Sequence, residues 1–238
     1  MGRAFEFRKA RKMKRWSNMS KTFTRIGREI IIAVKESGPD PSSNSRLRAI
    51  IQNAKAANMP KDNIERAIKK ASEKSSENFK EVLLEGYAPH GIAILVEAAT
   101  DNNNRTVANI RSYFNKCDGS LATSGSVDFL FDHLCFFQIK DQGIDIEELE
   151  LDLIDFGVIE LSKLENEISI TARFEDFGSI QKELERRGLE ISSSEFEREA
   201  KINKILTEDK RLKVERLINM IDEDEDVQNV YHDMKTID

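Results

Sequence analysis

The spacing of the apolar residues changes near residue 79, and this change limits the folds open to the chain. Before it, apolar side chains recur every three or four residues, which is the period of amphipathic helices. After it, short alternating or continuous apolar runs of strand length mix with helical segments. A chain of 238 residues with this order has room for two or three compact units. The pattern predicts an α+β multidomain protein with a helical front end.

Three amphipathic helices are predicted in the front end. The first runs from about Ser20 to Glu36 and ends at Ser37-Gly-Pro39. The second carries the apolar spacing from Leu47 to Ala54, and the third begins near Pro60, where the missing N–H of proline costs nothing. Short helices with short connections predict a small three-helix bundle.

The body reads as two α+β domains. Strands are predicted at Val82–Tyr87 and Ile92–Ala99, a helix at Thr106–Lys116, and a third strand where Val127, Phe129 and Phe131 alternate. The run Ile92–Val96 is continuously apolar, which is typical of a central strand covered on both faces.

From Leu134 onward the predicted elements follow the order β-α-β-β-α-β, the ferredoxin-like arrangement. Their expected bounds are 134–140, about 146–156, 158–164, 168–173, 179–187 and 189–196. A last helix and strand, at about 208–221 and 227–231, supply what the first α+β domain lacks, so the second domain is expected to be inserted in the first. The expected domains are a basic arm at 1–19, a helical bundle at 20–78, an α+β domain made of 79–133 and 205–238, and the inserted ferredoxin-like domain at 134–204.

Charge is distributed unevenly along the chain. Residues 1–80 carry a net charge of +12 and the remaining residues −18, within a total of −6. A basic segment of this size is the electrostatic footprint of a protein that binds a polyanion, usually nucleic acid. The acidic body is repelled by the same polyanion, so contact is expected at one end first.

The basic arm contains seven Lys or Arg residues among residues 1–19, interleaved with Phe5, Phe7 and Trp16. Cations neutralise phosphates, and aromatic rings stack on unpaired bases. The alternatives are that the aromatic residues only anchor the arm to its own domain and that the charged helix faces are only solvated. The candidate nucleic-acid-binding residues are Arg3, Arg8, Lys9, Arg11, Lys12, Lys14, Arg15, Trp16, Lys21, Arg25, Arg28, Arg46, Arg48, Lys55, Lys61, Arg66, Lys69 and Lys70. No motif for reading base edges accompanies them.

Catalytic, metal and cofactor motifs are not found. The three histidines are isolated, and phosphate-loop and dinucleotide patterns are absent. We therefore expect no enzyme activity, no cofactor, no metal and no small-molecule substrate. Cys117 and Cys135 lack metal spacing and are expected to be reduced and buried. With no apolar run long enough to cross a bilayer and no secretory signal, a cytoplasmic protein without membrane contact is expected.

Two loops leave alternatives open. Asp101, Asn102, Asn104 and Arg105 either cap the following helix or form a second polar site that binds an anion at the helix N-terminus. The segment Gly119–Gly125 is either a plain loop or a backbone N–H cradle for an anion. The acidic run Asp222–Asp226 lacks calcium-loop spacing and favours a solvated turn.

Several stretches resemble the YebC/PmpR family over nearly the whole chain. They are Ala56-Ala-Asn-Met-Pro-Lys-Asp-Asn-Ile-Glu-Arg-Ala-Ile68, Glu85-Gly-Tyr-Ala-Pro-His-Gly91, Thr100–Thr106, Gly125-Ser-Val127 and Asp226-Val-Gln-Asn-Val-Tyr-His232. Departures are the start of the chain, Ala88 and His90 where glycine is commoner, and Asn103 where arginine is. The missing cation at Asn103 weakens the case for phosphate binding by that loop.

The resemblance implies three domains and a cytosolic, DNA-binding transcriptional regulator. It also implies an alternative, because the family is similar to a mitochondrial translational activator and bacterial members are linked to the ribosome and to relief of stalled peptide synthesis. The expected partner is therefore DNA, or ribosomal RNA and the ribosome, and a monomer is expected. A metabolite-binding role rests on fold analogy alone.

Overall fold

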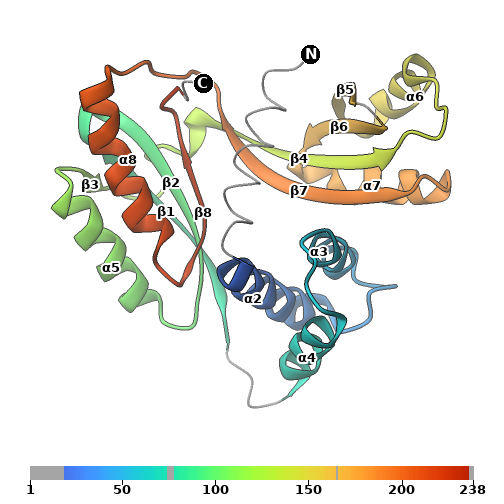
Figure 1. Ribbon diagram of the computed structural model, residues 1–238, viewed down its shortest axis with the longest axis horizontal. Helices are drawn as coiled ribbons and strands as arrows, with labels where there is room; N and C mark the ends of the chain where they lie inside the picture. Colours follow the sequence, from blue (N-terminus) through green and yellow to red (C-terminus); the bar gives the residue numbers. More distant parts are fainter. Residues whose placement is uncertain (1–18, 74–77, 165, 236–238) are drawn as a thin grey trace. The chain divides into compact units, whose positions relative to one another are not determined.

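The computed structural model describes residues 19–73, 78–164 and 166–235 (Figure 1). The chain divides into two compact units, one formed by residues up to 76 together with 133–197 and the other by 77–132 together with 198–238. The first unit contains the helical region and one sheet, and the second contains the other sheet. Both sheets have four strands among the described residues, and the protein has the expected α+β class.

The described N-terminal region contains α2 (Met19–Ser37), α3 (Ser45–Ala56) and α4 (Lys61–Ser72). The apolar spacing explains their packing, since Ile26, Ile30 and Val34 of α2 are buried. Asn44 joins the first two helices: its side chain accepts from Leu47 N at 2.9 Å as the N-cap of α3 and donates to the carbonyl oxygens of Ala33 and Gly38, both at 2.8 Å. Asn44 therefore fixes the turn that follows α2.

The sheet of the first unit contains β4 (Phe131–Lys140), β5 (Val158–Leu164), β6 (Glu167–Arg173) and β7 (Ile191–Ala200). Two helices, α6 (Ile146–Leu153) and α7 (Phe177–Arg186), accompany it. Its strand order is β5-β6-β4-β7, and the registers of β4 with β6 and of β5 with β6 are antiparallel. Alternate residues of β4 and β6 point into one core, which includes Phe137, Ile139 and Ile170. Leu153 of α6 and Leu184 of α7 cover that face.

The second unit contains β1 (Lys80–Ala88), β2 (Ile92–Thr100), α5 (Asn103–Lys116), β3 (Ser120–Leu121), α8 (Glu208–Asp222) and β8 (Val227–His232). Its strand order is β3-β1-β2-β8, and α5 and α8 lie side by side on one face (Figure 1). Ile94 and Val96 pack under these helices, whereas Leu95 packs on the other face with Val127 and Tyr231. Both faces of β2 are thus covered, as predicted.

The predicted strand through Val127, Phe129 and Phe131 is wrong. Asp128–Leu130 form a 3-10 turn, β4 begins at Phe131, and the side chain of Phe129 is 63% exposed. The physical reason is the carboxylate of Glu85, which is 2% exposed and accepts hydrogen bonds from the N–H groups of Gly125 (2.6 Å), Val127 (2.6 Å) and Asp128 (2.9 Å). Backbone N–H groups bound to a carboxylate are not available to a strand ladder.

An N–H cradle does form, but of the expected segment Gly119–Gly125 only Gly125 contributes to it, and the anion that it holds is the Glu85 carboxylate of the chain itself. Burial raises the pKa of Glu85, but the hydrogen bonds from Val127, Gly125 and Asp128 outweigh burial and hold it below its ordinary value.

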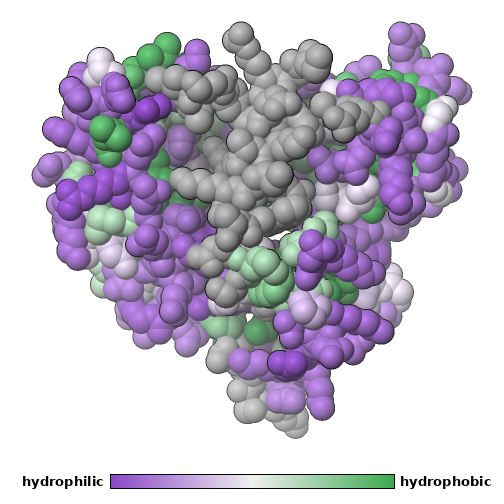
Figure 2. All heavy atoms as spheres, viewed as in Figure 1, coloured by the Kyte–Doolittle hydropathy of each residue, from purple (hydrophilic) through white to green (hydrophobic). Residues whose placement is uncertain are grey.

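Both cysteines are buried and unpaired, and burial raises the pKa of Cys135 to about 12. No helix in the described ranges is long and apolar enough to cross a membrane. Hydrophilic side chains cover most of the described surface in Figure 2.

Candidate nucleic-acid interface

The predicted cations fall into groups that differ in accessibility. Those of the basic arm lie outside the described residues; they are Arg3, Arg8, Lys9, Arg11, Lys12, Lys14 and Arg15, together with Trp16. On α2, Arg25 is only 9% exposed, and Lys21 and Arg28 are half-buried. Sequence spacing alone did not indicate that Arg25 is buried like its neighbour Ile26.

Two arginines of α3 are held by carboxylates. Arg46 pairs with Glu36 at 2.8 Å, and Arg48 pairs with Glu185 of α7 at 2.8 Å. Arg48 also donates to the carbonyl oxygen of Pro41 at 2.6 Å. A guanidinium that already bridges two elements of its own unit has fewer donors left for a phosphate, so Arg48 serves mainly to hold α3 against α7.

Lys55, Arg66 and Lys69 are exposed and make no ion pair with any described residue. Arg66 lies three residues before Lys69 and four before the exposed Lys70, so these side chains share one face of α4. Lys61 is also exposed and makes only a loose pair with Glu65 at 3.4 Å. The candidate cations that are exposed in the described front end thus lie on α4 and at the end of α3.

The joint between α3 and α4 sets the position of these cations. Asn58 has a φ of +58° and ends α3, with its N–H bonded to the carbonyl oxygen of Lys55 and that of Met59 bonded to Ala54. This is a Schellman cap with asparagine in the left-handed position that glycine usually takes. The side chain of Met59 is buried, and Pro60 is the N-cap residue of α4. Lys55 and Lys61 therefore flank a well-defined turn.

The second predicted polar site is a capping network. Asn102 is the N-cap of α5, and its side chain accepts from Arg105 N at 3.1 Å. The Arg105 guanidinium bonds Asp101 at 2.8 Å and Asp226 at 2.9 Å, and the hydrogen bonds to Asp226 and Asp101 raise its pKa. Asn104 is exposed beside them. An incoming anion would have to displace one of these carboxylates from Arg105.

The same network ties this loop to the acidic run, which the sequence did not connect with it. Asp226 is 3% exposed and accepts from Thr106 Oγ1 at 2.7 Å, while Asp224 accepts from Tyr113 OH at 3.0 Å. Burial, followed by the bond to Asp224, raises the pKa of Tyr113. The partners are more than 100 residues apart, so no local signal reveals them. Within the described ranges, no three His, Cys, Asp or Glu side chains are placed to hold a metal ion.

Comparison with known proteins covers nearly the whole chain. The profile of the TACO1/YebC protein N-terminal domain matches residues 3–74, and the profile of the TACO1/YebC second and third domain matches residues 79–234. A crystal structure of a conserved hypothetical protein from Aquifex aeolicus has a TM-score of 0.74 and 37% identity, and the match covers 91% of this chain and 90% of that one.

Curated relatives agree with the profiles. A "probable transcriptional regulatory protein" of Flavobacterium johnsoniae is 68% identical over 99% of both chains. A protein of the same description from Myxococcus xanthus is 50% identical over 98% of this chain and all of its own length. The chain therefore belongs to the TACO1/YebC family of probable transcriptional regulatory proteins, which is a non-enzymatic family.

Proposed function

We propose that this protein binds DNA through its basic front end and thereby regulates transcription. The observation that carries the proposal is the set of exposed cations Lys55, Arg66 and Lys69, which no carboxylate of the described chain neutralises. A cation already paired gains little from a phosphate, whereas an unpaired one releases the phosphate's counterions. The names of the relatives support the regulatory role.

One observation fits folded RNA as well as duplex DNA. The amide of Asn53, on the same helix as Lys55, is turned to the backbone of Ser194 in β7. Because the Asn53 side chain is occupied in this way, it is not available to read a base edge, and the Lys and Arg side chains near it are suited to phosphate contact. Phosphate contact alone serves an RNA surface as well as duplex DNA, so translational regulation through ribosomal RNA is the alternative.

We also propose the remaining finer assignments. The basic arm contributes phosphate contacts together with the cations of α3 and α4. The protein acts in the cytoplasm as a monomer. The segment 134–204 is a ferredoxin-like domain inserted in the other α+β domain, a proposal supported by the strand order β5-β6-β4-β7.

Ultraviolet crosslinking in living cells, followed by sequencing of the attached nucleic acid, tests the proposal. Enrichment of promoter DNA over random genomic DNA is the expected result. Enrichment of ribosomal RNA instead would identify RNA, the alternative partner, as the nucleic acid that the protein binds. The matched variant replaces Lys55, Arg66 and Lys69 with Gln in the full chain and should reduce the yield of either product. Recovery of neither DNA nor RNA, or an unchanged yield from this variant, would contradict the proposal.

A further inference from the structure

Three large apolar side chains are exposed close together in the sequence of the first unit. Leu151 is 71% exposed, Ile154 60% and Ile159 55%. On the same elements, Leu149, Leu153 and Val158 supply the residues that pack into or against the core. The exposed three, of which Ile154 lies in the 3-10 turn between α6 and β5, are therefore in excess of what the fold of this segment needs. A cluster of this kind is typical of a binding surface.

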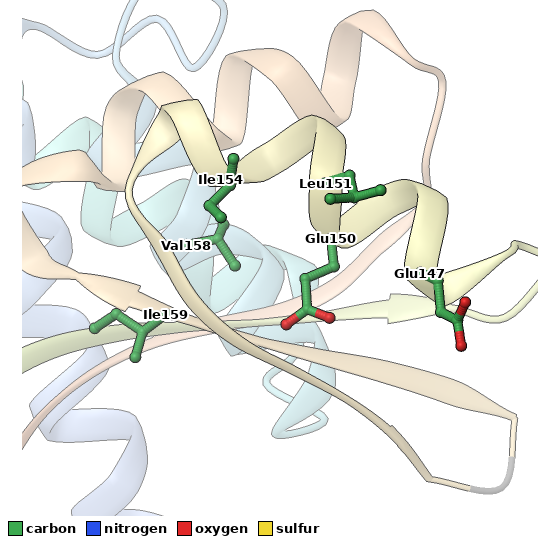
Figure 3. A pocket seen from close by; sticks show the side chains of 6 residues that line it. All are labelled: Glu147, Glu150, Leu151, Ile154, Val158 and Ile159. Atoms are coloured by element: carbon green, nitrogen blue, oxygen red, sulfur yellow. The ribbon is translucent and has the colours of Figure 1, made fainter.

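These side chains line a hollow between α6 and β5. The hollow has a volume of about 370 Å³, and its lining residues are Glu147, Glu150, Leu151, Ile154, Val158 and Ile159. Figure 3 shows Glu150 pointing from α6 towards β5, with Ile159 at one end of the hollow and Glu147 at the other. Apolar walls with carboxylates at the edge are complementary to a ligand segment that combines apolar side chains with Lys or Arg, whose apolar stems and cationic ends contact both kinds of surface. We call this surface the α6–β5 groove.

The strand that borders the groove is an edge strand. Among the described residues, β5 pairs with β6 on one side only, since it stands first in the strand order of its sheet. The pairing with β6 is itself irregular between Val158 and Glu160, which is where Ile159 lies. An edge strand offers unpaired backbone N–H and C=O groups, which an extended segment of another protein can join.

The two charged residues that line the groove, Glu147 and Glu150, are both acidic. Residues 141–160 include eight Asp or Glu and no Lys or Arg. Two of these carboxylates are engaged, Asp152 by Arg187 and Asp141 by Lys163. Glu147 and Glu150, which line the hollow, have no ion pair with any described residue. This sign repels phosphate chains and anionic lipid surfaces and attracts cationic segments.

We infer that the α6–β5 groove docks an extended, basic segment of a partner protein. Apolar side chains of that segment enter the hollow against Leu151, Ile154 and Ile159. Lys or Arg residues flanking them face Glu147 and Glu150, and the segment's backbone lies along the free edge of β5. Complementary charge indicates that the partner is itself a nucleic-acid-binding protein. Such proteins carry basic segments because their cations neutralise phosphates.

A photo-crosslinking residue placed at Leu151 of the full chain in cells tests the inference. The matched control places it at Leu212 of α8, which is 55% exposed. The expected product at Leu151 is a protein segment with apolar residues flanked by Lys or Arg, absent from the Leu212 control. A synthetic peptide of that segment should bind the purified full chain. Ile154→Asp and Glu150→Lys should each weaken the affinity for this peptide at least tenfold, while Ile202→Asp in the second unit should leave that affinity unchanged.

Every other outcome overturns the inference. These outcomes are a crosslink to residues 1–18 of the same chain, to a second copy, or to nucleic acid; an equal product from the Leu212 control; no product; and peptide binding that Ile154→Asp or Glu150→Lys leaves intact. All substituted side chains are exposed, and an unchanged melting temperature confirms that each variant folds. Because Ile154→Asp leaves the front end untouched, its nucleic-acid binding should persist, so a failure here is distinguishable from a failure of the proposed function.

Discussion

Asn53 of α3 and Ser194 of β7 exchange two hydrogen bonds. The Asn53 amide nitrogen donates to the carbonyl oxygen of Ser194, and the Ser194 N–H donates to Asn53 Oδ1 at 3.1 Å. β7 stands last in the strand order of its sheet as far as the chain is described, so the amide satisfies backbone groups that a neighbouring strand would otherwise pair. Ala49 joins the core of the same sheet, and α3 is thereby fastened to it by a polar and an apolar contact.

Replacing Asn53 with Ala should lower the free energy of unfolding by about 2 kcal/mol, because two backbone groups of Ser194 lose their partners. Asn53→Asp should be at least as harmful, since a carboxylate accepts from the N–H but cannot donate to the carbonyl oxygen. Urea unfolding at pH 7 measures both variants. A stability equal to wild type in Asn53→Ala would show that this contact does not hold α3 to the sheet.

The left-handed backbone of Asn58 gives a second prediction. Asn58→Ala should lower the free energy of unfolding by about 1 kcal/mol, because a Cβ at φ near +58° is unfavourable, while Asn58→Gly should match or exceed wild type. Asn203→Ala, at an exposed asparagine outside the positive-φ region, is the control and should change little. Thermal and urea unfolding distinguish the variants. Equal losses in the Ala and Gly variants would mean that the side chain of Asn58, and not its backbone, is what matters.

Local pattern predicted much of the fold. β5 begins and ends where expected, at Val158 and Leu164, since Gly157 in a left-handed conformation starts it. The helices α5, α7 and α8 also lie within a few residues of their predicted bounds. In each case the signal is periodic burial along one element, which neighbouring residues encode.

Long-range polar contacts were beyond the reach of the sequence. Alternating Val127, Phe129 and Phe131 satisfied a strand pattern, but the backbone there binds Glu85, some 40 residues earlier. The pairing of Arg48 with Glu185 is likewise invisible to periodicity. Spacing indicates which apolar residues share one face of a helix or strand, but it does not indicate which distant polar group a residue contacts. The candidate cations were therefore predicted as a class, and only the structure separates the paired from the unpaired.

The buried carboxylate of Glu85 gives a third prediction. Glu85→Gln should lower the free energy of unfolding by about 2 kcal/mol or more, because an amide has one acceptor oxygen for three N–H groups and turns a donor toward the rest. Glu223→Gln, at an exposed position of the same unit, should be nearly neutral. Urea unfolding measures both. A neutral Glu85→Gln would mean that the carboxylate does not hold the Gly125–Asp128 turn.

Acid should weaken the protein partly through Glu183. Hydrogen bonds from Arg186 and Arg187 lower its pKa from 4.5 to about 2. A group with a lowered folded pKa adds stability above its unfolded pKa and loses it as pH falls toward the folded one. Glu183→Gln should therefore flatten the fall in stability between about pH 4.5 and 2. Urea unfolding across this range measures it, and Glu160→Gln, at an exposed strand position, should leave the slope as in wild type.

The unpaired cations of the front end predict how nucleic-acid affinity responds to salt. Replacing Lys55, Arg66 and Lys69 with Gln should reduce the slope of log affinity against log salt by about 3, because each phosphate contact contributes roughly one unit. A matched variant replaces Lys210, Lys213 and Arg216 of α8, which are also exposed and make no ion pair with any described residue. Fluorescence anisotropy with duplex DNA and folded RNA measures both variants. Equal slopes would show that net charge, and not the α3–α4 surface, governs binding.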